Sequence, residues 1–252
     1  MIQNLNEELF SFIKKSPTGF HAVHEMANYL TEAGFERLAE GNTWNLAERG
    51  KYFVTRNQSA IIAFKVSRKD YSGFHIAASH SDSPTLKIKE SSEMNIENQY
   101  VKLNVEKYGG MLCAPWFDRP LSVAGRIIVK DGNRLTTKLI NVDRDLLMIP
   151  NLAIHMNREV NDGYKYNIQK DMLPLYRMSN SGKAFKEMIA EEAGVSVDQI
   201  QGMDLFLYNR MEGTVWGCDG EFISAPRLDD LQCAFTSTMA LLNSESDRCI
   251  PV

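Results

Sequence analysis

The sequence predicts an α/β fold in which a mostly β segment interrupts an α/β domain. Near both ends of the chain, hydrophobic residues recur at helical spacing beside short strand-like runs. In the middle, runs of β-branched and aromatic residues dominate. These changes of period predict a first part of an α/β domain at residues 1–90, a β-rich domain at 91–220, and the second part of the α/β domain at 221–252.

Two short helices are predicted to open the first part. Leu5, Leu9, Phe12 and Ile13 share one helical face, and the segment Ser16-Pro17-Thr18-Gly19 then breaks the helix. A second apolar stripe consists of Val23, Met26, Ala27 and Leu30, and Gly34 follows where a left-handed C-cap residue belongs. Strands are expected next at Lys51–Thr55, Ala60–Val66 and Phe74–Ser79.

The middle part is predicted to be mainly β. Strand-like runs occur at Val101–Val105, Ser122–Lys130 and Leu135–Asn141, and Asp131-Gly132 predicts a tight turn between the last two. Helical spacing returns at Lys183–Ala193, a strand is expected at Met203–Tyr208, and a helix at Leu231–Asn243.

Composition limits the classes of function. Hydrophobic residues make up 44% of the 252 residues and charged residues 24%, which is ordinary for a soluble globular protein. The net charge of -4 and the absence of a dense Lys/Arg run argue against nucleic acid as a partner. We expect no membrane span and no signal peptide. Four cysteines without Cys-x-x-Cys spacing indicate reduced thiols and a cytoplasmic protein.

The first candidate site is the segment His80-Ser81-Asp82-Ser83-Pro84, which follows a predicted strand. In an extended chain, residues two apart point the same way, so His80 and Asp82 are expected to share one side. Metal-binding histidines usually have the second ring nitrogen held by a carboxylate or carbonyl, a role that Asp82 could fill. A surface histidine beside a turn is the alternative interpretation of these residues alone.

The second candidate site is Pro226-Arg227-Leu228-Asp229-Asp230, just before a predicted helix. Adjacent acidic residues are favoured at a helix N-terminus by capping and by the helix dipole, which explains them without any site. In the functional interpretation, Asp229 is a carboxylate exposed at a loop-to-helix junction, able to lie between two cations, and Asp230 holds the geometry.

Five segments in order resemble the aspartyl aminopeptidase and vacuolar aminopeptidase I family of zinc metallopeptidases. They are Phe20-His21-Ala22-Val23, His80-Ser81-Asp82-Ser83-Pro84, Trp116-Phe117-Asp118-Arg119, Asn151-Leu152-Ala153-Ile154-His155 and Pro226-Arg227-Leu228-Asp229. The segments extend over nearly the whole chain, and five in the right order are far more specific than any one of them.

The resemblance implies a zinc-peptidase-like catalytic α/β domain interrupted by a β-rich dimerisation domain, two zinc ions, peptide substrates and a homo-oligomer. By position, His80 would be a ligand to one metal and Asp229 the carboxylate that bridges both. Asp82 would support His80. His155 would reach a neighbouring subunit's active site and steady the developing oxyanion there.

The chain departs from the family pattern at three places. Pro120 replaces an Asp after Trp-Phe-Asp-Arg, and Asp230 replaces an Asn after the bridging Asp. The Glu-Glu pair, the further acidic ligand and the final His of the family are missing, and all five histidines precede Asp229. We therefore expect the chain to be the N-terminal part of the enzyme and to be inactive alone.

Two other functions stay open at this point. A carboxypeptidase or deacylase of the same metal clan would share the His-x-Asp triplet and the bridging Asp, but not the Trp-Phe-Asp-Arg or Asn-Leu-Ala-Ile-His segments. A non-catalytic assembly or regulatory module would keep the dimerisation domain and lack the chemistry.

Overall fold

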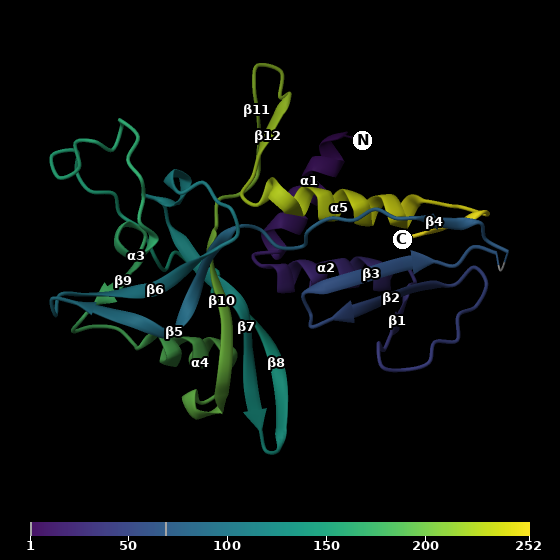
Figure 1. Ribbon diagram of the computed structural model, residues 1–252, viewed down its shortest axis with the longest axis horizontal. Helices are drawn as coiled ribbons and strands as arrows, with labels where there is room; N and C mark the ends of the chain where they lie inside the picture. Colours follow the sequence, from purple (N-terminus) through teal and green to yellow (C-terminus); the bar gives the residue numbers. More distant parts are fainter. Residues whose placement is uncertain (1, 69) are drawn as a thin grey trace. The chain divides into compact units, whose positions relative to one another are not determined.

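The computed structural model describes residues 2–68 and 70–252, and these residues form two compact units. Unit 1 combines the chain up to Ser83 with Glu212–Val252, and unit 2 is the continuous segment Pro84–Met211. The chain therefore leaves unit 1 once and returns to it once (Figure 1). The roles of these parts as catalytic and dimerisation domains stay predictions.

Unit 1 is built from three helices and short strands. The helices are α1 (Ile2–Lys15), α2 (Gly19–Glu32) and α5 (Leu228–Asn243). The strands are β1 (Glu36–Leu38), β2 (Lys51–Arg56), β3 (Ala60–Lys65), β4 (Gly73–His75), β11 (Thr214–Trp216), β12 (Phe222–Ser224) and β13 (Cys249–Pro251). They form a three-stranded sheet β1-β2-β3 and the pairs β11-β12 and β13-β4.

The helices of unit 1 pack together through their predicted apolar faces. Phe12 of α1 and Phe235 of α5 are fully buried, with ring centroids 5.7 Å apart, and Val23 and Met26 of α2 join the same cluster. A smaller cluster holds α2 to the sheet (Figure 1). Gly34 has a φ of 81° just past the end of α2, which confirms it as the left-handed residue expected there.

Unit 2 is a six-stranded antiparallel sheet with a helix on its core. Strand order is β8-β7-β10-β5-β6-β9. The strands are β5 (Thr85–Ile96), β6 (Tyr100–Tyr108), β7 (Leu121–Asp131), β8 (Arg134–Asn141), β9 (Leu175–Met178) and β10 (Ile200–Asn209). The helices are α3 (Ile168–Asp171) and α4 (Phe185–Ala193), with 3-10 turns at Ala114–Trp116 and Val197–Gln199.

A single large cluster of side chains fills unit 2. Alternate residues of the strands point into it, among them the fully buried Leu103, Leu121 and Ile127, and α4 adds Phe185 and Ile189. The predicted β character of the middle part is confirmed, including the turn at Gly132 between β7 and β8. Strands β5 and β9 lie outside the runs that sequence reasoning named.

One predicted strand is shorter than expected. The run Phe74–Ser79 was predicted as a strand, but β4 ends at His75. The reason is its neighbour, because β13 pairs with β4 only from Gly73 to His75. Two further backbone hydrogen bonds, from Val252 N to His75 O at 2.8 Å and from Ala77 N to Val252 O at 3.0 Å, end this contact. Residues 76–84 are therefore irregular backbone rather than strand.

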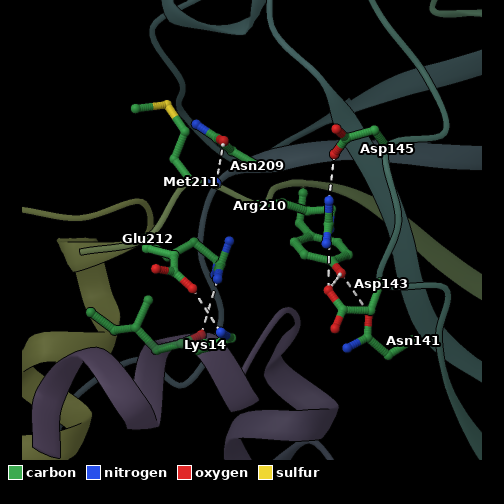
Figure 2. A network of polar contacts seen from close by, with 11 residues as sticks. Lys14, Asn141, Asp143, Asp145, Asn209, Arg210, Met211 and Glu212 are labelled. Carbon is green, nitrogen blue, oxygen red and sulfur yellow. Dashed lines mark hydrogen bonds and ion pairs between the residues drawn. The ribbon is translucent and has the colours of Figure 1, made fainter. Parts of the chain in front are cut away.

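Ion pairs fix the end of β10 and the start of the following segment, each within its own unit. In unit 2, Arg210 donates to Asp143 Oδ1 at 3.1 Å and also contacts Asp145. In unit 1, Lys14 Nζ lies 2.7 Å from Glu212 Oε1 (Figure 2). Within the described residues, no helix combines the length and apolar character that crossing a bilayer requires.

Candidate metal-ligand site

His80 and Asp82 lie on the irregular segment after β4, and they contact each other directly. His80 Nδ1 is 3.2 Å from Asp82 Oδ1, and the two side chains are 76% and 40% exposed. The predicted pairing of these residues is present, although it does not arise from strand geometry as the sequence suggested. With Nδ1 turned toward a carboxylate, the opposite ring nitrogen of His80 is the one left for a ligand.

The segment that carries His80 and Asp82 is held by two other parts of unit 1. Ser81 donates from Oγ to the carbonyl of Ser59 at 3.1 Å. On the other side, the backbone passes close to Gly19, where an added Cβ would stand 3.2 Å from Asp82 Cβ. A side chain at position 19 would therefore press on Asp82, which gives Gly19 a steric role at the start of α2.

Asp229 and Asp230 occupy the first turn of α5, where the backbone is distorted. Asp229 has a φ of -86° and a ψ of 108°, outside the helical range, and the peptide bond that joins it to Asp230 is cis. The preceding Arg227 is left-handed at a φ of 59° and donates from Nη2 to the carbonyl of Ile13 at 3.0 Å. Simple N-capping therefore does not describe this turn, because Asp229 has non-helical φ and ψ.

Residues of both candidate segments of unit 1 influence the pKa of Asp230. Partial burial raises the pKa of Asp230, and the hydrogen bond with Asp229 and the charge of Asp229 raise it further. Asp82 adds a smaller effect in the same direction, and His80 opposes it by lowering the pKa. Electrostatic interactions thus link His80 and Asp82 of the first segment to Asp230 of the second.

These residues supply donors of the right kind for zinc, but few of them. Imidazole nitrogen and carboxylate oxygen are both zinc ligands, and a zinc site usually takes three or four protein ligands. Across residues 2–68 and 70–252, no group of three or more His, Cys, Asp or Glu side chains is arranged to hold a metal. The described donors therefore fit part of a zinc site.

His21 lies near the same end of α5 but has a different environment. The pKa of His21 is lowered to about 4, mainly by burial and also by the charges of His24 and Arg227. Its Nδ1 is 2.9 Å from the hydroxyl oxygen of Thr18. His21 is therefore a neutral, packed side chain at neutral pH, and its place in unit 1 is structural.

His155 belongs to unit 2, on the long loop between β8 and α3, where its side chain is exposed. The start of this loop is held by Asp118, a residue to which sequence reasoning gave no role. Asp118 Oδ1 accepts from the backbone nitrogen of Asn151 and Oδ2 accepts from its side-chain amide, both at 2.8 Å. Hydrogen bonding to the backbone of Asn151, and then to its side chain, lowers the pKa of Asp118.

Comparison with known proteins assigns the family. The family model described as aminopeptidase I zinc metalloprotease (M18) matches residues 12–251. A probable M18 family aminopeptidase 2 of Clostridium acetobutylicum is 47% identical over 255 residues, which is 98% of this chain and 59% of that protein. This chain therefore spans about three fifths of the length of that relative.

Solved structures agree with this assignment. Chaetomium thermophilum mApe1 superposes with a TM-score of 0.89 at 33% identity, over 100% of this chain and 61% of that one. The S. cerevisiae mApe1 dodecamer gives a TM-score of 0.80 at 25% identity, over 99% of this chain and 59% of that one. The mixed α/β fold is thus that of M18 aminopeptidases over about three fifths of their length. The chain belongs to the aminopeptidase I zinc metalloprotease family, M18.

Proposed function

We propose that this chain is the N-terminal part of a zinc-dependent aminopeptidase that removes N-terminal residues from peptides. The observation that carries the proposal is the match of residues 12–251 to the aminopeptidase I zinc metalloprotease family, and the contact of His80 with Asp82 supports it. His80 and Asp229 are the proposed metal ligands, and the remaining ligands and the general base come from the two fifths of the relatives' length that this chain does not match.

Each residue has a defined part in the proposed chemistry. Asp82 accepts the Nδ1 proton of His80, which fixes the tautomer and presents Nε2 to a metal. Asp229 offers a carboxylate that can bridge two cations, with Asp230 behind it. When bound, zinc ions polarise the scissile carbonyl and activate water. His155 donates a hydrogen bond to the oxyanion that forms at that carbonyl in a neighbouring subunit.

The test is hydrolysis of an aminoacyl reporter, together with zinc content by mass spectrometry, in the protein that includes this chain. Asp229→Ala should lose both zinc and turnover. His155→Ala should keep its zinc, and its turnover should fall about 10²- to 10³-fold, the usual effect of removing one oxyanion donor. His75→Ala is a matched control, since His75 is another exposed histidine of unit 1.

Mixing the two inactive variants tests the contribution between subunits. We propose that copies of this chain associate through unit 2, and the dodecamer of the S. cerevisiae relative supports such an assembly. Some interfaces in mixed oligomers would then pair an intact Asp229 with an intact His155 and recover part of the turnover. Turnover should recover only when subunits exchange, so exchange is measured in the same samples. If subunits exchange and turnover does not recover, His155 does not act in the neighbouring subunit's site.

A zinc-loaded protein with no peptidase turnover would contradict the enzyme proposal. It would favour the non-catalytic assembly module instead, with self-association through unit 2 as its remaining activity.

A further inference from the structure

Both ends of the loop that carries His155 contact the same residue of unit 2, Phe117. At its start, Ile149 forms an isolated parallel bridge with Phe117. At its end, the ring of Tyr166 lies against the ring of Phe117, with centroids 4.9 Å apart. Phe117 is 6% exposed and Ile149 is fully buried. The two ends of this stretch are therefore fixed to one buried point of the core.

Between these anchors the loop has mainly local bonding. Met156 N donates to Ala153 O at 2.8 Å and Asn157 N donates to Ile154 O at 3.3 Å, which are turns within the loop itself. The side chains around His155 are exposed, with Leu152 at 64% and Met156 at 75%. Local turns hold the loop's shape but not its direction. The direction in which His155 points therefore depends on how the loop leaves its first anchor.

Asp118 controls that departure through three hydrogen bonds. Its backbone nitrogen donates to Ile149 O at 2.9 Å, and its carboxylate accepts from both the backbone and the side chain of Asn151 at 2.8 Å. The backbone of Asp118 is left-handed, with a φ of 54°, a conformation that Asp and Asn tolerate better than most residues. Asp118 thus holds both Ile149 and Asn151, the two neighbours of position 150, through hydrogen bonds.

We infer that Asp118 is a positioning residue that sets the direction of the loop that presents His155. It does so through the two hydrogen bonds that its carboxylate accepts from Asn151, which we call the clasp. The inference rests on the proposed function for its consequence in catalysis. The clasp itself is a property of unit 2 and can be tested without turnover.

The first measurement is amide hydrogen exchange of residues 151–157 in the full chain. Asp118→Gly removes the carboxylate while glycine still accepts the left-handed backbone. Asn151→Ala removes one bond and leaves residue 118 unchanged, so it serves as a second variant if the first folds poorly. Asp118→Gly should speed exchange of the residue 151 amide and its loop by about 10-fold, and Asn151→Ala, which keeps the backbone bond to Asp118, by less, with the strands of unit 2 unaffected in both. Unchanged exchange in both variants would overturn the clasp.

A swap of the two side chains gives a rescue. Asn151→Asp alone places two carboxylates against each other and should open the clasp. Adding Asp118→Asn restores it, because the side-chain amide then present at position 118 can accept from the backbone amide of residue 151 and donate to the new carboxylate. Exchange in the double variant should return to within about 3-fold of the wild type. A swap that leaves the loop as open as Asn151→Asp alone would contradict the inference.

The second measurement separates positioning from a general structural role. In active protein, Asp118→Gly should lower kcat by about 10- to 10²-fold with little change in KM. In a His155→Ala background it should lower kcat no further, because there is no longer a histidine to position. Equal losses in both backgrounds would overturn the positioning role. If the wild type itself fails to hydrolyse the reporter, the proposed function fails, and the exchange experiments alone then decide the clasp.

Discussion

Units 1 and 2 differ in how their strands and buried side chains are organised. Unit 2 has a six-stranded sheet and one continuous core, whereas unit 1 divides its strands among three small sheets and its buried side chains between two clusters. Both units expose large apolar side chains, among them Ile76 at 70% in unit 1 and Leu112 at 80% in unit 2. The part of the chain that carries the candidate metal ligands is thus the part whose core is divided.

The difference teaches that the two units should respond separately to denaturants and to substitutions. Unit 2 is one continuous segment with its own core, as expected of an independently stable region. The three tryptophans report on the units individually, since Trp44 and Trp216 lie in unit 1 and Trp116 in unit 2. Fluorotryptophan labelling followed by ¹⁹F NMR in urea can therefore follow each unit in the same sample.

The largest expected effect is the loss of unit 2 on Gly125→Ala. Gly125 of β7 pairs with Leu205 of β10, and an added Cβ would stand 2.0 Å from the carbonyl oxygen of Asp204. Because backbone must move, we expect a loss of about 3 kcal/mol or more in the free energy of unfolding of unit 2, reported by Trp116. The Trp44 and Trp216 signals should change much less.

Gly202→Ala is the matched control, in the neighbouring strand β10. Its added Cβ would meet only Ile128 Cδ1, at 3.7 Å, an ordinary contact. The free energy of unfolding should change by less than about 1 kcal/mol. Equal destabilisation by the two alanines would show that the contact between β7 and β10 differs from the one described.

The second effect is a pH dependence confined to unit 1. Burial holds the pKa of His21 at about 4, against an ordinary 6.5 when the chain is unfolded. Between these values the unfolded state binds more protons, so the contribution is complete above pH 6.5 and is lost as the pH falls through 4. The difference corresponds to about 3 kcal/mol in the stability of unit 1.

The measurement is urea unfolding at several pH values between 7 and 4, in wild type and in His21→Gln. Subtracting the variant removes the contribution of carboxylates that titrate in the same range. On acidification, the free energy of unfolding reported by Trp44 and Trp216 should lose the contribution of His21. The free energy reported by Trp116 should not. An identical pH profile for wild type and variant would mean that His21 titrates normally in the folded state.

Zinc should have a smaller effect, again on unit 1 alone. With His80 and Asp229 as the proposed ligands from this chain, binding should be micromolar or weaker. Zinc at about ten times its Kd would stabilise unit 1 by about 1.4 kcal/mol, and His80→Ala should remove that gain while the control His75→Ala should not. Submicromolar binding by calorimetry that disappears in His80→Ala would show that the chain supplies more ligands than proposed.

The sequence predicted the elements of unit 2 better than the local geometry of the candidate site. The apolar and β-branched run Ser122–Lys130 marked β7, which contributes Val123, Ile127 and Val129 to the core of unit 2. The end of β4 was missed because it is set by the three residues of β13, which lie far along the chain. The clasp between Asp118 and Asn151 joins residues 33 positions apart, so no local pattern marks it. The contact of His80 with Asp82 was found because it is local.

The smallest effect concerns the acidic residues of the candidate site and should have the opposite sign. Partial burial raises the pKa of Asp230 most, and its hydrogen bond with Asp229 and the negative charges of Asp229 and Asp82 raise it as well. Without a metal, these carboxylates therefore repel one another. Asp230→Asn removes one charge and keeps the shape of the side chain. Because the site is partly exposed, we expect unit 1 to gain only a few tenths of a kcal/mol at pH 7. Asp247→Asn, at another exposed acidic residue of unit 1, should give no gain.

Excess zinc should make unit 1 of the wild type more stable than that of Asp230→Asn, since a bound cation is stabilised by every nearby carboxylate. Urea unfolding followed by Trp44 and Trp216, with and without zinc, measures both signs. A loss of stability in Asp230→Asn without metal would mean that Asp230 holds the first turn of α5 in place, and that its charge serves the fold of unit 1 rather than a metal.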